Sequence, residues 1–231
     1  MLTAFLPCRA GSQRVPHKNT RTFGGDRTGL LGIKLRQLLA VPELDRILLS
    51  TNDPEVIALA EPFLAANPGR MVLDRRPDHL CSSATSTDEV IAYLPTVIAE
   101  GDVLWTHVTS PFLGSTDYSE AIRLYREARA AGTHDSLMGV LELRTFIWTQ
   151  DGPLNYDRNV EKWPRTQTLP VYYEVNSSVF LAPRATYVET GDRIGRTPLL
   201  WSVSKDRSFD VDWEEDFVLA SDIWQLRHAP R

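Results

Sequence analysis

Cysteine, long apolar runs and an excess of positive charge are all scarce or missing in this sequence. Its two cysteines, Cys8 and Cys81, cannot build the disulfide framework of a small secreted domain, and they fit a reducing compartment. No apolar run approaches the ~18 residues typical of a membrane-spanning helix, and the first residues do not have the pattern of a secretory signal. The 25 basic and 30 acidic side chains give a formal charge of −5, which disfavours broad binding to nucleic acid or to an anionic membrane. We therefore expect a soluble, cytoplasmic protein that binds neither.

Several common site motifs are also missing. There is no G-x-x-x-x-G-K-[ST] loop and no G-x-G-x-x-G after a predicted strand, which argues against a P-loop NTPase and against a dinucleotide site. The five histidines and two cysteines lack the spacing of zinc ligands. No G-x-S-x-G elbow supports a Ser/His/Asp triad.

Apolar patterns alternate between the periods of strands and helices along most of the chain. The 231 residues, 42% of them hydrophobic, suffice for one large domain that spans residues 1–231. Strands are predicted at Leu2–Leu6, Arg46–Thr51, Met71–Leu73, Val103–Val108 and Val175–Leu181. The alternation predicts an α/β fold with a three-layer, mainly parallel sheet. Ligands are then expected at the carboxyl ends of the strands.

Capping residues indicate where several helices begin. Asp53, followed by a proline, is predicted to cap one helix, and Ser86 and Glu89 have capping-box spacing for the next. Asp117 with Glu120 is expected to open a further helix. Apolar faces predict two more helices, one through Leu31, Leu35, Leu38 and Leu39 and one through Phe217, Ala220, Ile223 and Trp224.

The alternation breaks between about residues 143 and 173. This stretch mixes tryptophan and proline with Asn, Asp and Arg, and it is too long for an ordinary connection. We predict a protruding element within the domain, either a lid or a dimerisation arm.

A basic loop follows the first predicted strand. Arg9, Arg14 and Lys18 surround Gly11 and Ser12. Glycine lets the backbone approach a ligand and turn its N–H groups toward an anion, while the cations supply charge for a polyphosphate. We interpret the loop as a nucleotide-triphosphate site; the alternative is a solvated surface loop that keeps the protein soluble.

Two carboxylates near the end of the chain are candidate metal ligands. In extended backbone, Asp210 and Asp212 point the same way, so both can meet one cation. Mg²⁺ typically takes one or two carboxylates and completes its shell with water and substrate phosphates. The alternative is helix capping, because Asp212 and Glu215 have the spacing of an N-terminal cap pair.

Two further polar segments follow predicted strands. Ser50–Asp53 and Thr109–Pro111 could line a cleft, where their hydroxyls would donate to a base or a sugar. Their plainer interpretation is turn and cap chemistry.

Six segments carry, in order along the chain, the motifs of a known family. The first is Leu6–Asn19, with a Pro-x-Arg-x-Gly-Ser start and a Lys-Asn end. The others are Ser50–Asp53, Arg76–Asp88, Thr109–Pro111, Arg165–Asn176 and Phe209–Phe217. Together they resemble the N-acylneuraminate cytidylyltransferases, the CMP-sialic acid synthetases, over nearly the whole chain.

This resemblance implies a Rossmann-like nucleotidyltransferase fold in which the anomeric hydroxyl of a nine-carbon 2-keto sugar acid attacks the α-phosphate of CTP. The CMP-sugar forms and pyrophosphate leaves. The implied catalytic residues are Arg9, Lys18, Asp210 and Asp212, with Mg²⁺ held by the two aspartates. The residues implied to bind the nucleotide are Arg9, Gly11, Ser12, Arg14, Lys18, Asn19, Arg76 and Ser83. Those implied to bind the sugar acid are His107, Thr109, Ser110, Arg165 and Gln167. The resemblance also implies a homodimer, in which the arm enters the partner subunit and Arg165 acts across the interface.

The sequence departs from the family pattern at several positions. His107-Val108 replaces the usual Gln-Pro, and this Gln is a ligand-contacting position in the family. Ser177 replaces a common Gly, Asn52 a common Asp, and Cys8 a common Ala. The change at position 8 is small and should be tolerated. His107 keeps open CMP transfer to Kdo, legionaminate or pseudaminate, and His107 with Ser177 keeps open a nucleotide-sugar-binding protein that does not catalyse. The loop ending Val15–Asn19 favours an acylneuraminate over Kdo.

Overall fold

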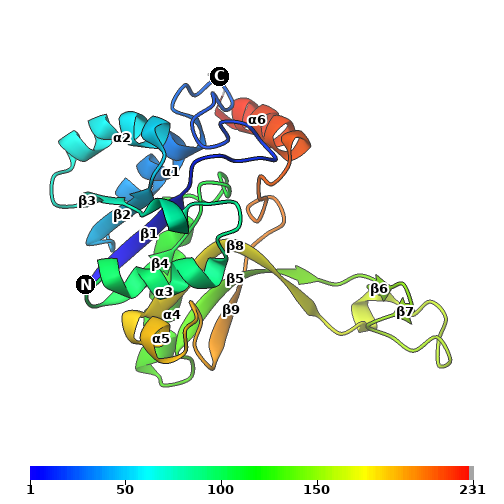
Figure 1. The fold of residues 1–231 in the computed structure, drawn as a ribbon. Coiled ribbons are helices and arrows are strands. Elements are labelled where there is room, and N and C mark those ends of the chain that lie inside the picture. Colours follow the sequence, from blue (N-terminus) through cyan, green and yellow to red (C-terminus); the bar gives the residue numbers. More distant parts are fainter. Residues whose placement is uncertain (229–231) are drawn as a thin grey trace.

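The computed structural model describes residues 1–228, which form a central sheet with helices packed on both faces (Figure 1). Its strands are β1 (Leu2–Cys8), β2 (Arg46–Thr51), β3 (Met71–Arg75), β4 (Asp102–Trp105), β5 (Ser136–Leu143), β8 (Tyr172–Pro183) and β9 (Pro198–Ser202). The helices are α1 (Gly29–Leu39), α2 (Pro54–Ala66), α3 (Thr87–Val97), α4 (Ser115–Ala130), α5 (Arg184–Glu189) and α6 (Glu214–His228). None of the helices in this part of the chain combines the length and the apolar character needed to cross a membrane.

The sheet is mainly parallel, as predicted, and its strand order is β3-β2-β1-β4-β8-β5-β9. The pairs β1–β2, β2–β3, β1–β4 and β5–β9 are parallel. Strand β8 is antiparallel to both of its neighbours, β4 and β5. The sequence pattern indicates this strand but not its direction, which follows from the way the chain returns to the sheet.

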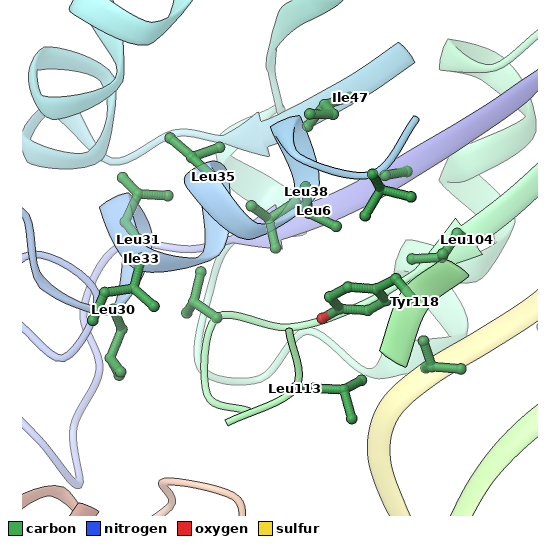
Figure 2. Packing of buried hydrophobic residues seen from close by; sticks show 14 of the residues in the cluster. Leu6, Leu30, Leu31, Ile33, Leu35, Leu38, Ile47, Leu104, Leu113 and Tyr118 are labelled. Carbon is green, nitrogen blue, oxygen red and sulfur yellow. The ribbon is translucent and has the colours of Figure 1, made fainter. Parts of the chain in front are cut away.

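Two hydrophobic clusters cover the two faces of the sheet. Along β1, Ala4 and Leu6 belong to one cluster and Phe5 to the other, because successive side chains of a strand point to opposite faces. The first cluster packs α1, α2, α4 and α6 against the sheet, and the second packs α3 and α5. Figure 2 shows the first cluster, in which leucines of α1 lie over Leu6 and close to Tyr118 of α4. This arrangement is the predicted three-layer architecture.

Most of the predicted helix starts are confirmed. The Asp53 carboxylate accepts a hydrogen bond from the Glu55 N–H at 2.9 Å, and Ser86 and Glu89 form a reciprocal capping box. The prediction for α4 was displaced: the helix begins at Ser115, and the Asp117 carboxylate reaches back to the Gly114 N–H at 2.8 Å. Asp117 is therefore the third residue of the helix rather than its opening.

Strand β4 is shorter than predicted, since it ends at Trp105 rather than at Val108. The residues that follow it turn away from the sheet, although the Thr106 N–H still donates to the Phe5 carbonyl at 3.2 Å. His107 therefore lies in a turn at the carboxyl end of β4, where an α/β sheet presents side chains to a ligand.

Residues 144–171 leave the sheet after β5, extend away from it and return on β8 (Figure 1). We call this segment the arm and the remainder the body. The arm contains the short hairpin β6 (Trp148–Thr149) and β7 (Gly152–Pro153) and a cluster of aromatic rings from Phe146, Trp148, Tyr156 and Trp163. The predicted protruding element is therefore present, whereas its part in a dimer stays a prediction.

Candidate active site

A cavity of about 630 Å³ opens at the carboxyl ends of β1, β3 and β4. The predicted site residues that line it are Arg9, Ser12, Arg14, Lys18, Asn19, Arg76, Ser83, His107, Thr109, Asp210 and Asp212. The fold therefore brings together side chains from the start, the middle and the end of the chain.

The basic loop after β1 forms one side of the cavity. Its turn passes through Gly11 at φ +70°, a conformation that favours glycine. The Ala10 N–H donates to the Asn52 side chain at 3.2 Å, which ties the loop to the end of β2. Arg9 is exposed at the rim, whereas Lys18 donates to the Val211 carbonyl at 2.9 Å.

The acid pair, Asp210 and Asp212, lies in contact with this loop. Val211 between them is fully buried, and its N–H donates to the Thr109 carbonyl at 2.9 Å. Both carboxylates line the cavity, and Asp212 forms an ion pair of 2.9 Å with Arg14. The backbone of Val211 thus has two contacts, one with the turn that follows β4 and one with the Lys18 side chain. Together they fix the segment that carries the acid pair.

The capping alternative for Asp212 and Glu215 is wrong. The carboxylate of Asp216 accepts hydrogen bonds from the N–H groups of Asp212 and Trp213, at 3.1 and 2.8 Å. Because Asp216 caps the start of α6, the carboxylates of the acid pair stay directed to the cavity.

Burial and mutual repulsion set the charge states here. Burial raises the pKa of Asp210, and the neighbouring Asp212 charge raises it further, against a hydrogen bond from Thr109 and the Lys18 charge. Burial lowers the pKa of Lys18, and the two carboxylates oppose that shift. Two carboxylates this close can hold a divalent cation whose other ligands are water or phosphate. Within residues 1–228 no group of three or more His, Cys, Asp or Glu side chains is placed to hold a metal.

A second wall of the cavity comes from the segment between β3 and α3. Arg76 is almost fully buried, and its Nε donates to the Cys81 sulfur at 3.1 Å. Ser83 and the helix-capping Ser86 follow on the same wall. Arg76 therefore shapes this wall as well as facing the cavity.

The third wall contains His107, whose tautomer is set by a neighbour. The Trp105 indole N–H donates to His107 Nε2 at 3.0 Å. Burial, together with nearby cations, lowers the pKa of His107 to about 3, so the ring is neutral at physiological pH. The ring proton then sits on Nδ1, which makes this atom a hydrogen-bond donor.

Sequence reasoning missed two residues of the third wall, Trp105 and Arg193. Arg193 lies in the loop between α5 and β9, and its guanidinium packs 3.7 Å from the centre of the Phe180 ring. No motif surrounds this arginine, so only the path of the chain reveals it.

Three predicted sugar-binding residues do not line the cavity. Ser110 is buried behind it, with 1% exposure. Arg165 and Gln167 are exposed residues of the arm, which extends away from the sheet (Figure 1), and neither lines the cavity.

A buried lysine behind the site was also missed. Lys34 of α1 has no exposed surface, and it donates to the carbonyls of Ser110 and Leu113, at 2.8 and 3.3 Å, and to the Tyr118 hydroxyl at 2.7 Å. Burial lowers the pKa of Lys34 to about 7. This ammonium holds the turn whose Thr109 carbonyl receives the Val211 N–H.

A cavity that opposes cations to carboxylates suits the phosphates of a nucleotide and the cation that accompanies them. Its position, at the carboxyl ends of parallel strands, is where open α/β sheets bind nucleotides. Fold and site together therefore define a nucleotide-binding α/β protein.

Comparison with known proteins identifies the family within this class. The sequence profile described as "Cytidylyltransferase" matches residues 3–190. The chain therefore belongs to the cytidylyltransferase family.

Two curated relatives match almost the whole chain at low identity. An N-acylneuraminate cytidylyltransferase from Escherichia coli is 26% identical over 234 residues, which cover 100% of this chain and 54% of that protein. A CMP-N,N'-diacetyllegionaminic acid synthase from Legionella pneumophila is 24% identical over 233 residues, which cover 97% of each chain. The chain thus spans about half the length of the first relative and nearly all of the second.

Solved structures share the fold. A CMP:2-keto-3-deoxy-manno-octonic acid synthetase complexed with CTP has a TM-score of 0.65 at 12% identity, covering 98% of this chain and 99% of that one. A 4-diphosphocytidyl-2C-methyl-D-erythritol synthase from Anaerococcus prevotii has a TM-score of 0.67 at 14% identity, covering 97% and 96%.

Proposed function

We propose that this protein transfers CMP from CTP to the anomeric hydroxyl of a sialic-acid-like nonulosonic acid and releases pyrophosphate. The observation that carries the proposal is that the cations of the basic loop and the carboxylates of the acid pair line the same cavity. The names of the two curated relatives support a nonulosonic acid as the acceptor.

In this reaction Arg9, Arg14 and Lys18 hold the triphosphate and then the leaving pyrophosphate. Phosphoryl-group transfer needs mainly alignment and neutralisation of developing charge, and fixed cations supply both. Lys18 is held in place by the Val211 carbonyl, so it meets the phosphates without first being ordered.

The acid pair fits Mg²⁺, which we propose as the cofactor. Asp210 and Asp212 are oxygen donors that repel one another, and burial raises the pKa of Asp210, so a divalent cation between them would be stabilised. Bound there, Mg²⁺ would neutralise phosphate charge and make the attacking hydroxyl more acidic.

The sugar acid would lie between the acid pair and the wall that contains His107. Thr109 lines this part of the cavity, and the neutral His107 ring offers a donor to a hydroxyl or carbonyl. Arg165 and Gln167 would come from the arm of a partner subunit, which makes the active form a homodimer. The free buried thiols Cys8 and Cys81 support a cytoplasmic location.

A related acceptor is the second candidate. His107 stands where the family has a ligand-contacting Gln, and one relative is named for a legionaminic acid derivative. Legionaminate, pseudaminate and Kdo are therefore tested as acceptors of CMP beside N-acetylneuraminate.

The experiment is pyrophosphate release from CTP and Mg²⁺ with each of these four acids. Controls contain EDTA, or ATP, GTP or UTP in place of CTP. Metal-dependent release with CTP and one acid would confirm the reaction and identify the acceptor. Tight CTP binding without release on any of the acids would contradict the proposal and favour a non-catalytic nucleotide-sugar-binding protein.

A further inference from the structure

At one wall of the cavity, an arginine side chain packs on two aromatic rings. The Arg193 guanidinium lies 3.7 Å from the centre of the Phe180 ring and 5.4 Å from that of Trp105, and the arginine lines the cavity. Trp105 itself is 1% exposed, so the rings form a rigid support. Cation–π packing of this kind orients a guanidinium and leaves its edge free to donate.

Within residues 1–228 the Arg193 guanidinium makes neither a hydrogen bond nor an ion pair; only its backbone N–H is bonded, to Asp192 Oδ1 at 2.6 Å. Other cations of the cavity differ. Arg14 pairs with Asp212, and Lys18 is bonded to a backbone carbonyl. Burial also lowers the pKa of Arg193, which shows that its charge is partly desolvated. A partly desolvated donor without a protein partner costs free energy, and an acceptor group of a ligand in the cavity would offset that cost.

A second donor lies beside this cation. Trp105 contacts both His107 and Arg193. Its indole N–H is bonded to His107 Nε2, and the Arg193 guanidinium packs over its ring. The bond fixes the proton of the neutral imidazole on Nδ1, which has no hydrogen-bond partner within residues 1–228. The wall therefore presents an N–H group and a guanidinium, and both donate.

This donor pair lies away from the reacting end of the cavity. Lys18 is bonded to the carbonyl of Val211, the residue between the two aspartates. Arg193 instead packs on the rings of Trp105 and Phe180, and within residues 1–228 it forms no ion pair with either aspartate. In a 2-keto acid the C1 carboxylate is attached to the anomeric carbon, so it must stay near the acid pair. Arg193 therefore faces another part of the acceptor.

We propose that Arg193 and the Nδ1–H of His107 form a subsite for a planar oxygen acceptor, an acyl carbonyl or a second carboxylate, on the acceptor acid away from its reacting hydroxyl. This inference rests on the proposed function. A planar acceptor can receive both donors at once, whereas a single hydroxyl or a methyl group leaves the desolvated guanidinium unpaired. The subsite thus determines which substituent the enzyme selects.

The test compares three acids that differ at one carbon. N-acetylneuraminate carries an acyl amide there, its deaminated analogue carries a hydroxyl, and an N-succinyl analogue adds a carboxylate. The variants are Arg193→Met, which keeps the apolar stem, and His107→Phe, which removes the donor. Arg196→Met, in the same loop and exposed, is the matched control.

We expect Arg193→Met to lower kcat/KM about ten-fold or more for the acyl or the succinyl acid, mainly through KM, because a hydrogen bond to a charged group is lost. Turnover of the hydroxyl analogue should change less than about three-fold, and Arg193→Lys should restore part of the preference. The acid that loses more identifies the carbonyl or the carboxylate as the partner. An equal loss on all three acids, or no loss on any, would overturn the subsite.

Titration calorimetry of the same acids, in the presence of CTP and without turnover, separates this inference from the proposed function. If the wild type releases no pyrophosphate with any acid, the proposed function fails. Selective weakening of acid binding by Arg193→Met would still support the subsite, and unchanged binding would overturn it.

Discussion

The body and the arm use the same aromatic residues in opposite ways. In the body, Trp105 is 1% exposed and packs against Phe5 and Tyr187 between sheet and helices. On the arm, Trp148 and Trp163 are 46% and 63% exposed, and their ring centres lie 6.5 Å apart within the aromatic cluster that they form with Phe146 and Tyr156. Trp105 is part of a hydrophobic core, whereas the two tryptophans of the arm are not.

The difference indicates what each region needs for its stability and its function. The cavity is lined by body residues of one chain, and buried contacts hold its walls. The arm exposes apolar rings and carries Arg165 and Gln167 away from the cavity. A cluster of exposed aromatic residues is typical of a surface that contacts another protein. The comparison therefore supports the proposal that a second subunit covers the arm.

The largest expected effect is on folding of the body. Leu6→Ala removes a fully buried side chain and should lower the free energy of unfolding by about 2–5 kcal/mol. Trp163→Ser should change it by less than about 0.5 kcal/mol at protein concentrations where the chain is monomeric. Urea denaturation of both variants measures the contrast. A comparable loss from Trp163→Ser would show that the arm contributes to the stability of the folded chain as the core does. That result would contradict the contrast between body and arm.

The next effect is on turnover and concerns the acid pair. Asp210→Asn and Asp212→Asn keep the side-chain size but remove a charge, and each should lower kcat by roughly 100-fold or more if the carboxylates hold the metal. Asp222→Asn, an exposed carboxylate of α6, is the control and should retain activity. Near-normal rates in both acid-pair variants would exclude the proposed metal site.

The arm should affect turnover only in trans. Arg165→Ala is expected to lower kcat/KM about ten-fold or more, because a charged contact to the sugar acid is lost. Mixing this variant with Asp210→Asn should restore activity, since one site of each mixed dimer then combines an intact cavity with an intact arm. No restoration, with mixed dimers shown by mass spectrometry, would contradict the exchange of arms.

The smallest expected effect is a pH dependence of stability that belongs to Lys34. Its pKa is lowered to about 7 by burial from an ordinary 10.5. Between these values the unfolded chain binds more protons than the folded chain, so the free energy of unfolding rises with pH. The stability of the wild type relative to Lys34→Met should therefore increase by roughly 1.5 kcal/mol between pH 7 and 8.5.

Urea denaturation of the two proteins at both pH values measures this difference. Lys162→Met, on the exposed arm, is the control and should follow the wild type at both pH values. If the difference in the free energy of unfolding between the wild type and Lys34→Met stays constant with pH, Lys34 does not titrate in this range.

Much of the fold could be predicted because local signals agree with the tertiary structure. Strand β2 has its predicted bounds, and the caps at Asp53 and Ser86 are side-chain bonds to nearby backbone that short sequence windows reveal. The direction of β8 could not be predicted, because it depends on where the arm re-enters the sheet.

The site divides in the same way. The basic loop and the acid pair are short motifs, and the structure brings both to one cavity. Lys34 interrupts a run of leucines and resembles a solvent-exposed residue of an amphipathic helix, yet α1 is covered on that side by the turn after β4. Arg193 has no motif at all, and its role depends on the rings of β4 and β8 beneath it. Such residues are determined by packing between distant segments, which local patterns do not encode.

The bond from Lys18 to the Val211 carbonyl joins groups 193 residues apart, and the Gly24 N–H donates to Ser221 across 197. During synthesis, the five strands and four helices that precede the arm leave the ribosome long before Asp210 does. Contacts of this length close late, because the entropy of closing so large a loop is lost before the contacts stabilise the fold. The candidate site is therefore completed late in synthesis, and a chain cut short after β9 would keep much of its core but lack the two carboxylates.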